Sequence, residues 1–164
     1  MDAVSYTPIG IIRTPHTAIE GMPVQNVGAA DVRGTIEIAP EYAAGLRDLD
    51  GFSQLILLFH MHEVRGHELA VRSFIEGPSG PLRGIFATRS PKRPNPIGLT
   101  IVRLIAVDGA TVTVEGVDIL DGTPLLDIKP YLPAFDGRAA ERIGWYAGVI
   151  DGAANIRADD RFQR

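Results

Sequence analysis

Short apolar runs punctuated by glycine and proline form the main pattern along the chain. Within each run the apolar residues either follow one another directly or alternate with polar residues, and both patterns are typical of β-strands. Gly10, inside the first run, predicts a bulge. We expect strands at residues 5–13, 34–38, 53–62 and 68–74, and a hairpin of residues 97–107 and 111–117 around the turn dipeptide Asp108-Gly109.

Few stretches of the chain favour a helix. Residues 40–49 are the best candidate, because Pro40 suits a first helical turn and the alanines that follow are good helix formers. Residues 14–33 have no sustained period and are expected to form a long loop. Residues 116–136 contain repeated Gly and Pro turn signals, which exclude a helix and predict a second rigid loop system.

Strands with short spacings and few intervening helices indicate an antiparallel sheet. We therefore predict a mostly β fold, an antiparallel β-barrel with one short helix that occupies residues 1–150 as a single domain. Trp145, Tyr146 and Val149 are expected to anchor the end of this domain on the barrel. Residues 151–164 form a C-terminal tail, and from Ala153 onward the tail is expected to fray.

Composition narrows the class of protein. A length of 164 residues matches one domain, and 45% hydrophobic with 22% charged residues is ordinary for a globular chain. No apolar run approaches the roughly 20 residues of a membrane span. The N-terminus lacks the features of a signal peptide and there is no cysteine, which predicts a cytoplasmic protein without disulfides. Zero cysteine also excludes a thiol nucleophile and any cysteine-ligated metal site.

Charge is distributed unevenly along the chain. The net charge of −4 argues against phosphate-backbone binding by the whole surface. Residues 84–104, GIFATRSPKRPNPIGLTIVRL, nevertheless lack acidic side chains, and three prolines stiffen their middle. Cations on a rigid loop suit carboxylate or phosphate recognition, although a solvated basic loop is the plainer alternative. The cations in and beside this stretch are Arg83, Arg89, Lys92, Arg93 and Arg103.

Histidines gather at the end of the strand expected at residues 53–62. His60 and His62 point the same way in an extended strand, and His67 follows closely. Such a group resembles metal ligands, but histidines beside a carboxylate more often line a polar site.

A second polar group lies in the segment DGTPLLDIKPY. Asp127, Lys129 and Tyr131 share one side of an extended segment by period-two counting. These residues suit either a substrate or an internal ion pair between Asp127 and Lys129.

Three long motifs distinguish the chain, which has no GxGxxG, GxxxxGK or GxSxG sequence. With GFSQLILLFHMHE, RSPKRPNPIGL and DGTPLLDIKPY it resembles the TsaA-like family, to which tRNA-methyltransferase O belongs. The resemblance covers about the first 150 residues. It implies a dimeric, β-barrel, S-adenosylmethionine-dependent methyltransferase, in a short form without the C-terminal domain of the full-length tRNA enzymes.

The resemblance also implies roles for individual residues. S-adenosylmethionine is the expected cofactor and no metal is expected. The family's cofactor contacts correspond here to Pro23, Val24, Gln25, His62, Glu63, Arg89, Leu99, Asp121, Gly122, Thr123 and Pro124. Substrate contacts are expected from Lys92, Arg93, Asn95, Asp127, Lys129 and Tyr131.

The implied reaction is N6-methylation of threonylcarbamoyl-adenosine at position 37, next to the anticodon of tRNA. The carboxylate of this nucleoside would suit Lys92 or Arg93, and an unstacked loop base enters a pocket more readily than a paired one. Methyl transfer from a sulfonium requires alignment rather than a metal. An exocyclic nitrogen must lose a proton as it attacks, and Asp127 and Tyr131 are candidate acceptors, although no catalytic residue is identified.

Two other classes of function remain open. A methyltransferase for a small molecule agrees with the modest total of 16 Lys and Arg residues. A non-catalytic S-adenosylmethionine-binding or interaction module is the other class. Turnover of the cofactor to S-adenosylhomocysteine separates an enzyme from such a module. The expected partners are tRNA and a second copy of the chain.

Overall fold

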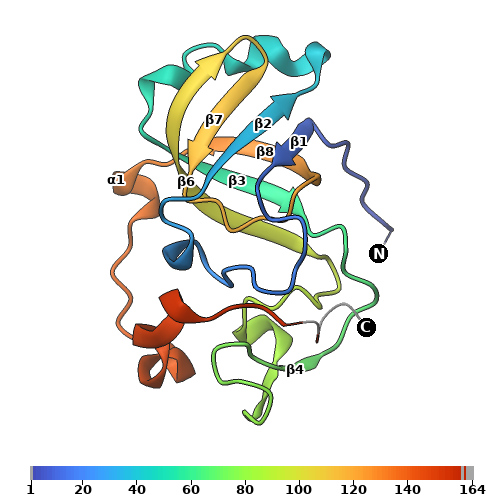
Figure 1. The fold of residues 1–164 in the computed structure, drawn as a ribbon, viewed down its shortest axis with the longest axis vertical. Coiled ribbons are helices and arrows are strands. Elements are labelled where there is room, and N and C mark those ends of the chain that lie inside the picture. Colours follow the sequence, from blue (N-terminus) through green and yellow to red (C-terminus); the bar gives the residue numbers. More distant parts are fainter. Residues whose placement is uncertain (1, 160, 162–164) are drawn as a thin grey trace.

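The part of the chain that the structure describes, residues 2–159 and 161 of a computed structural model, contains a closed antiparallel β-barrel. Around the barrel the strands follow the order β1-β2-β7-β6-β3-β8, and β8 closes onto β1 (Figure 1). The mostly β barrel predicted from the sequence is therefore confirmed. The strands are β1 Gly10–Arg13, β2 Arg33–Ile38, β3 Gln54–His60, β6 Ile97–Asp108, β7 Thr111–Glu115 and β8 Thr123–Pro130.

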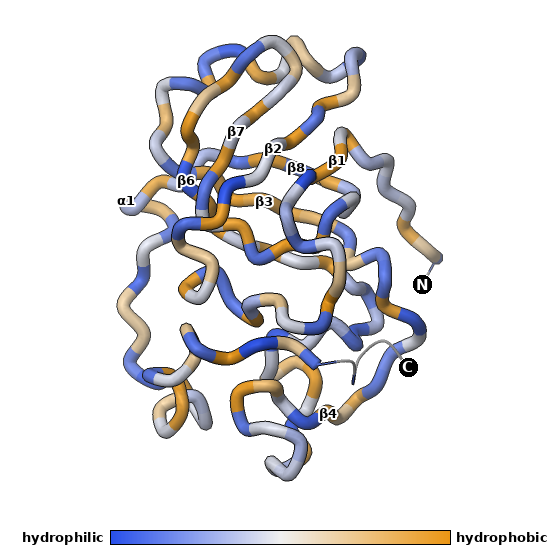
Figure 2. Tube along the Cα trace, in the orientation of Figure 1, coloured by the Kyte–Doolittle hydropathy of each residue, from blue (hydrophilic) through white to orange (hydrophobic). Residues whose placement is uncertain are grey.

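Alternating side chains explain why this sheet closes around a core. Every second residue of β2 and β7 faces inward, so that Ile36, Val112 and Val114 are completely buried. Each such side chain contributes about 1.5–3 kcal/mol relative to leaving it exposed. Figure 2 shows β3 as a nearly continuous hydrophobic run, and this strand is paired on both sides, with β6 and β8.

Strand β8 corrects the expectation of a loop throughout residues 116–136. It pairs with β3 and with β1, where Leu125 lies opposite Gly10. Its prolines occupy the second and last positions of the strand, near its ends, where a missing backbone donor is tolerated best. Residues 116–122, which precede the strand, and residues 131–132, which follow it, remain loop as expected.

The helices also differ from the prediction. Residues 40–49 contain a short 3-10 helix, η2 (Pro40–Leu46), and a 3-10 turn follows at η3 (Leu49–Gly51). The α-helix that the described residues contain, α1 (Pro133–Asp136), lies in the segment whose prolines were expected to exclude helices. A proline is compatible with the first turn of a helix because its missing N–H would be unpaired there in any case.

At two positions the structure explains why the residue is a glycine. Strand β1 begins at Gly10 in regular register with β2, so the predicted bulge is wrong. A Cβ atom at Gly10 would lie 2.4 Å from the backbone oxygen of Glu37, which shows that the two strands approach too closely for a side chain. The β6–β7 hairpin is confirmed, but Asp108 pairs with Thr111. The turn is therefore one residue further along, with a φ of +57° at Gly109.

A smaller unit lies below the barrel in Figure 1. It contains the two-stranded sheet of β4 (Ala70–Arg72) and β5 (Leu82–Gly84), followed by the 3-10 turn η4 (Ile85–Ala87). Strand β4 confirms the strand expected within residues 68–74. The C-terminal 3-10 helices are η5 (Gly144–Gly148) and η6 (Ile150–Asn155), and η6 contacts η1 (Asn26–Gly28).

The C-terminal segment is held by backbone hydrogen bonds. Gly21 N donates to Ala158 O at 2.9 Å, and Ala158 N donates to Met22 O at 2.8 Å. The fraying predicted from Ala153 onward is therefore wrong for residues 153–159, whereas residues 160 and 162–164 lie outside the described part of the chain. Over the described residues, no helix combines the length and the hydrophobicity that a membrane crossing requires.

Candidate functional site

A cavity of about 680 Å³ opens where β3 ends and β6 begins. This volume lies within the range of small-molecule sites, roughly 300–1,000 Å³. The wall combines apolar side chains, such as Phe59 and Ile101, with polar ones. It comes from the long loop (residues 14–32), the residues after β3 and β4, the proline-rich loop (residues 88–96), the start of β6, the loop before β8, Tyr146 and Ala158.

Most of the residues predicted to bind the cofactor meet in this cavity. They come from parts of the chain up to 100 residues apart, since Pro23 and Thr123 both contribute. Segments so distant in sequence meet because the barrel brings the long loop, the end of β3 and the start of β8 to one end. The predicted residues in the wall are Pro23, Val24, Gln25, His62, Glu63, Arg89, Leu99 and Thr123.

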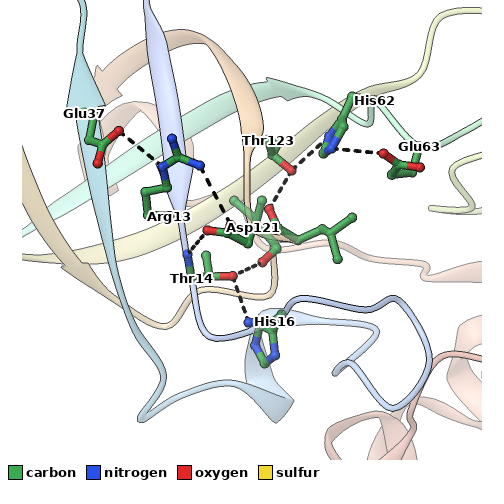
Figure 3. A network of polar contacts seen from close by, with 10 residues as sticks. Arg13, Thr14, His16, Glu37, His62, Glu63, Asp121 and Thr123 are labelled. Carbon is green, nitrogen blue, oxygen red and sulfur yellow. Dashed lines mark hydrogen bonds and ion pairs between the residues drawn. The ribbon is translucent and has the colours of Figure 1, made fainter.

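The remaining predicted cofactor residues lie next to the cavity but not in its wall. Asp121 accepts a hydrogen bond from the backbone N–H of Thr14 at 3.0 Å (Figure 3). Gly122 has a φ of +77°, and its N–H donates to a β1 carbonyl. Pro124 is part of β8. These residues fix the two loops that border the cavity, a role that the motif alone does not reveal.

Arg89 is held in position by the long loop. Its Nη1 donates to Oε1 of Gln25 at 3.1 Å, and the side chains belong to segments 64 residues apart. Arg89 is exposed at the cavity wall. A guanidinium has five N–H donors, so donors remain for an anionic group of a ligand.

His62 connects the end of β3 to the start of β8. Its Nδ1 lies 3.4 Å from Oγ1 of Thr123, and its Nε2 lies 3.5 Å from a carboxylate oxygen of Glu63 (Figure 3). Thr123 in turn donates to the backbone oxygen of Leu120 at 2.7 Å. The histidine therefore has a polar contact at each ring nitrogen and is a fixed part of the wall.

The histidines predicted as possible metal ligands do not gather. His62 lines the cavity, whereas His60 is the last residue of β3 and His67 is exposed. In residues 2–159 and 161, no three His, Asp or Glu side chains are placed so that they could hold a metal ion.

Two cations of the proline-rich loop, Lys92 and Arg93, donate to backbone oxygens of the protein. Lys92 is only 4% exposed, and its Nζ donates to the backbone oxygen of Arg65 at 3.0 Å. Arg93 reaches the cavity wall, but its Nη1 donates to the carbonyl of Thr88 at 2.9 Å. Asn95 is exposed. The expected substrate contact of Lys92 therefore disagrees with its burial, because its ammonium group is already used to hold the loop.

The other predicted substrate residues do not join the cavity. Asp127 and Lys129 form an ion pair at 2.7 Å, which is the alternative that the sequence left open. Asp127 borders a separate hollow beneath η2, with Tyr42 and Leu46. Tyr131 lines neither of these two spaces.

The sequence missed the contribution of the C-terminal segment. Tyr146 and Ala158 line the cavity, and Trp145 stacks on Tyr146 with ring centroids 3.9 Å apart. The indole Nε1 of Trp145 donates to the backbone oxygen of Ala87 at 2.8 Å. The predicted anchor exists, but it attaches to the smaller unit rather than to the barrel.

The sequence also missed Asp118. This residue lines the cavity between the buried residues Val117 and Ile119. Burial raises the pKa of its carboxyl, while the hydroxyl of Thr100 and the charges of Arg89 and His16 lower it to a smaller extent. The available signal was the alternation of Asp118 with apolar residues, which the prediction attributed to a loop.

Two polar atoms in the cavity wall lack partners. Within the described part of the chain, neither Oδ1 of Asp118 nor Oγ of Ser90 has a hydrogen bond, although both atoms are shielded from solvent. Buried polar atoms normally have a partner. The apolar surface of the wall and the remaining donors of Arg89 suit a polar ligand that also has an apolar or aromatic part. The two unpartnered atoms add hydrogen-bonding capacity when their side chains turn toward such a ligand.

These features define a small β-barrel protein with a ligand-sized cavity at one end. Among the described residues no Rossmann sheet contributes to it, and the sequence contains no glycine-rich phosphate loop. The chain belongs to the family of the tRNA-methyltransferase O N-terminal domain, whose model matches residues 11–137. The family assignment made from the motifs is thereby confirmed.

Known relatives agree with this assignment. A probable S-adenosyl-L-methionine-binding protein of Pyrococcus abyssi is 44% identical over 159 residues, which cover 97% of this chain and 85% of the relative. A tRNA (adenine(37)-N6)-methyltransferase of Mus musculus is 39% identical over 137 residues, covering 79% of this chain and 31% of the mouse protein. The crystal structure of TrmO from Pseudomonas aeruginosa matches with a TM-score of 0.71 and 36% identity, covering 88% of this chain and 63% of that one. The chain thus spans most of the archaeal relative and less than two thirds of the other two.

Proposed function

We propose that this chain is an S-adenosylmethionine-dependent methyltransferase that methylates N6 of threonylcarbamoyl-adenosine at position 37 of tRNA. The observation that carries the proposal is the cavity, whose wall contains most of the residues that the family resemblance associates with the cofactor. Membership of the tRNA-methyltransferase O family supports it. The mouse relative, which is named for the modification of adenine 37, supports the tRNA substrate.

The wall offers complementary groups for the parts of the cofactor. Arg89 has donors for the carboxylate of the methionine part. Glu63, with a carboxylate beside His62, suits an amino group. Leu99, which is 52% exposed on β6 at the cavity, provides apolar surface for the adenine ring. Bound S-adenosylmethionine would supply a methyl group on a positively charged sulfur.

The protein's own contribution is alignment and a controlled environment. Side chains fixed by contacts on both sides, such as His62 and Arg89, lose little freedom when a ligand binds. Alignment of a donor and an acceptor within a site can remove about 7–11 kcal/mol of a bimolecular barrier. A site without cysteine is sufficient for this chemistry, since no covalent enzyme intermediate is required.

The tRNA contact does not rest on a large basic surface. The net charge is −4, and Lys92 and Arg93 donate to backbone oxygens of the chain. Arg65, which follows Val64 of the cavity wall, is exposed, as is Asn95. We therefore expect few phosphate contacts and recognition mainly of the modified base within the cavity.

The working unit that we propose is a homodimer with the cofactor sites near the subunit boundary. Ile97 and Leu99 are exposed apolar residues on β6 beside the cavity. A two-fold partner that covered them would bury this surface. Light scattering at micromolar concentration is expected to give the mass of a dimer, and an active monomer would contradict this expectation.

A second candidate is a cofactor-binding module without methyl transfer. The archaeal relative, which is named only for binding S-adenosyl-L-methionine, favours it. The two candidates differ in the fate of the cofactor, because only an enzyme converts it to S-adenosylhomocysteine.

One assay tests both candidates. The purified chain is incubated with labelled cofactor and with tRNA from cells that have, or lack, the threonylcarbamoyl group. We expect label only in the modified tRNA, recovered by mass spectrometry as the N6-methylated nucleoside. Label in neither pool, with cofactor bound and not consumed, would support the binding module. Cofactor turnover with extracts depleted of RNA would instead support a small-molecule substrate.

A further inference from the structure

Asp118 is the most enclosed carboxylate of the cavity. Among the described residues of the wall, only Asp118 and Glu63 carry carboxylates. The side chain of Glu63 is 57% exposed and lies beside His62. Asp118 follows the completely buried Val117, and its Oδ1 is shielded from solvent. The two carboxylates therefore occupy very different environments within one site.

The surroundings of Asp118 act on its carboxyl without saturating it. Thr100, a buried residue of β6 in the same cavity wall, lowers the pKa of the carboxyl, although burial raises that pKa more. Arg89 and His16 are the charged and titratable groups whose fields act on it. Oδ1 has no hydrogen-bond partner within the described part of the chain. This oxygen therefore has unmet hydrogen-bonding capacity, and a rotation of the side chain must turn it into the cavity before a ligand donor reaches it.

Methylation of an exocyclic adenine nitrogen requires such an acceptor. The nitrogen lone pair is delocalised into the ring, so the nitrogen becomes a nucleophile only as its proton leaves. An acceptor with an elevated affinity for protons and limited solvation is best suited to this task. A well-hydrated carboxylate has a lower pKa than a buried one and is therefore a weaker base.

The other titratable groups fit this task less well. Asp127 pairs with Lys129 at 2.7 Å and lies at a separate hollow, and Tyr131 is outside the cavity wall. His62 has polar contacts at both ring nitrogens. These positions leave Asp118 as the enclosed carboxylate of the cavity wall, with one oxygen that has no hydrogen-bond partner among the described residues.

We propose that the Asp118 carboxylate accepts the proton that the acceptor nitrogen, N6 of the modified adenosine, loses during transfer. The inference rests on the proposed function. In this step N6 forms a C–N bond to the methyl group, and the C–S bond of the sulfonium breaks with its electron pair retained by sulfur. The N6–H proton passes to the Asp118 carboxylate, whose shielded Oδ1 turns toward the ligand, and from there to solvent when the products leave. The products are the N6-methylated nucleoside and S-adenosylhomocysteine.

The decisive variant is Asp118→Asn, which keeps the shape of the side chain and removes its basicity. The cofactor dissociation constant, measured by calorimetry on the full chain, is expected to stay within threefold of the wild-type value. The single-turnover rate of methyl transfer to modified tRNA is expected to fall by about 100-fold or more, the usual contribution of a general base. The exposed residue Asp50, on η3 and outside the cavity wall, provides the matched control Asp50→Asn, with no change in either quantity.

The pH dependence provides a readout that a purely structural role would not alter. The wild-type rate is expected to fall toward acid pH as Asp118 becomes protonated. Asp118→Glu is expected to be faster than Asp118→Asn and to show the same decline in rate toward acid pH. The residual rate of Asp118→Asn is expected not to show this decline. An NMR titration of the cofactor-free protein should find the Asp118 pKa above the ordinary aspartate value.

Each other outcome overturns a defined statement. Full activity of Asp118→Asn, or an ordinary titration of Asp118, overturns the role of this residue and leaves the proposed function intact. A loss of cofactor affinity that accounts for the whole loss of rate shows that Asp118 binds the cofactor and overturns proton acceptance. Absence of methyl transfer by the wild-type chain overturns the proposed function, and the role of Asp118 with it.

Discussion

Replacement of Lys92 by Met is expected to destabilise the protein, not simply to weaken tRNA binding. Lys92 is 4% exposed, and its ammonium group donates to the backbone oxygen of Arg65 at 3.0 Å. This contact joins the proline-rich loop to the segment after β3, and both form part of the cavity wall. Methionine keeps most of the apolar stem and removes the charged donor, so the substitution isolates the loss of hydrogen bonding.

The expected magnitude follows from the kind of contact. A hydrogen bond from a charged group contributes about 1.5–3 kcal/mol to stability. For a chain of 150–250 residues, each kcal/mol shifts the melting temperature by about 2–4 °C. Lys92→Met should therefore lower the melting temperature by about 3–12 °C. The control is Lys129→Met, because that side chain is 58% exposed in a surface ion pair, and such pairs contribute about 0.2–1 kcal/mol.

Thermal unfolding and calorimetric titration with the cofactor test this reasoning together. We expect Lys92→Met to lower the melting temperature and to weaken cofactor binding, because the loop that carries Arg89 loses its hydrogen bond to Arg65. Lys129→Met should lower the melting temperature only slightly, as expected for the loss of a surface ion pair, and should leave cofactor binding unchanged. An unchanged melting temperature of Lys92→Met, combined with loss of tRNA methylation, would refute the structural role and restore Lys92 as a substrate contact.

Three further predictions concern the cavity. Arg89→Ala should weaken cofactor binding by about 1.5–3 kcal/mol, or roughly 10- to 150-fold; calorimetry in the presence of a chelator measures it, and an unchanged constant removes Arg89 from the site. Because burial raises the pKa of Asp118, this carboxyl stabilises the folded state only at acid pH, and its contribution is lost as the pH rises through the folded pKa. Asp118→Asn should therefore gain melting temperature over the wild type as the pH increases from about 4 to neutral, and a constant difference would contradict this sign. Trp145→Ala removes the hydrogen bond to Ala87 and the stack on Tyr146; faster limited proteolysis of the C-terminal segment is expected, and wild-type resistance would show that other contacts hold it.

Much of the barrel was predictable from local pattern. The alternation of residues 34–38 and the Val- and Ile-rich hairpin identify β2, β6 and β7, because a strand with one buried face needs period-two hydrophobicity. Strand β8 was not predictable in the same way. Its prolines are strong turn signals, and only pairing with β1 and β3 shows that they fall near the strand ends.

The residues of the candidate site likewise include some that the sequence predicted and some that it did not. The family resemblance pointed to Gln25, His62 and Arg89, and all three residues line the cavity. It did not indicate that Lys92 turns inward, since burial depends on the path of the whole proline-rich loop. It did not identify Asp118 either, because an aspartate in a predicted loop resembles any turn residue.

The sequence by itself determined the fold class, the family and the type of residue available for chemistry, since these depend on periodicity, on contiguous motifs and on the absence of cysteine. Only the tertiary structure decided which of those residues face the cavity. A long loop, two strand ends and the C-terminal segment meet there through contacts between distant positions, such as Gly21 with Ala158. The pKa of Asp118 is likewise a product of burial by these neighbours, and no local pattern specifies how deeply a carboxylate is enclosed.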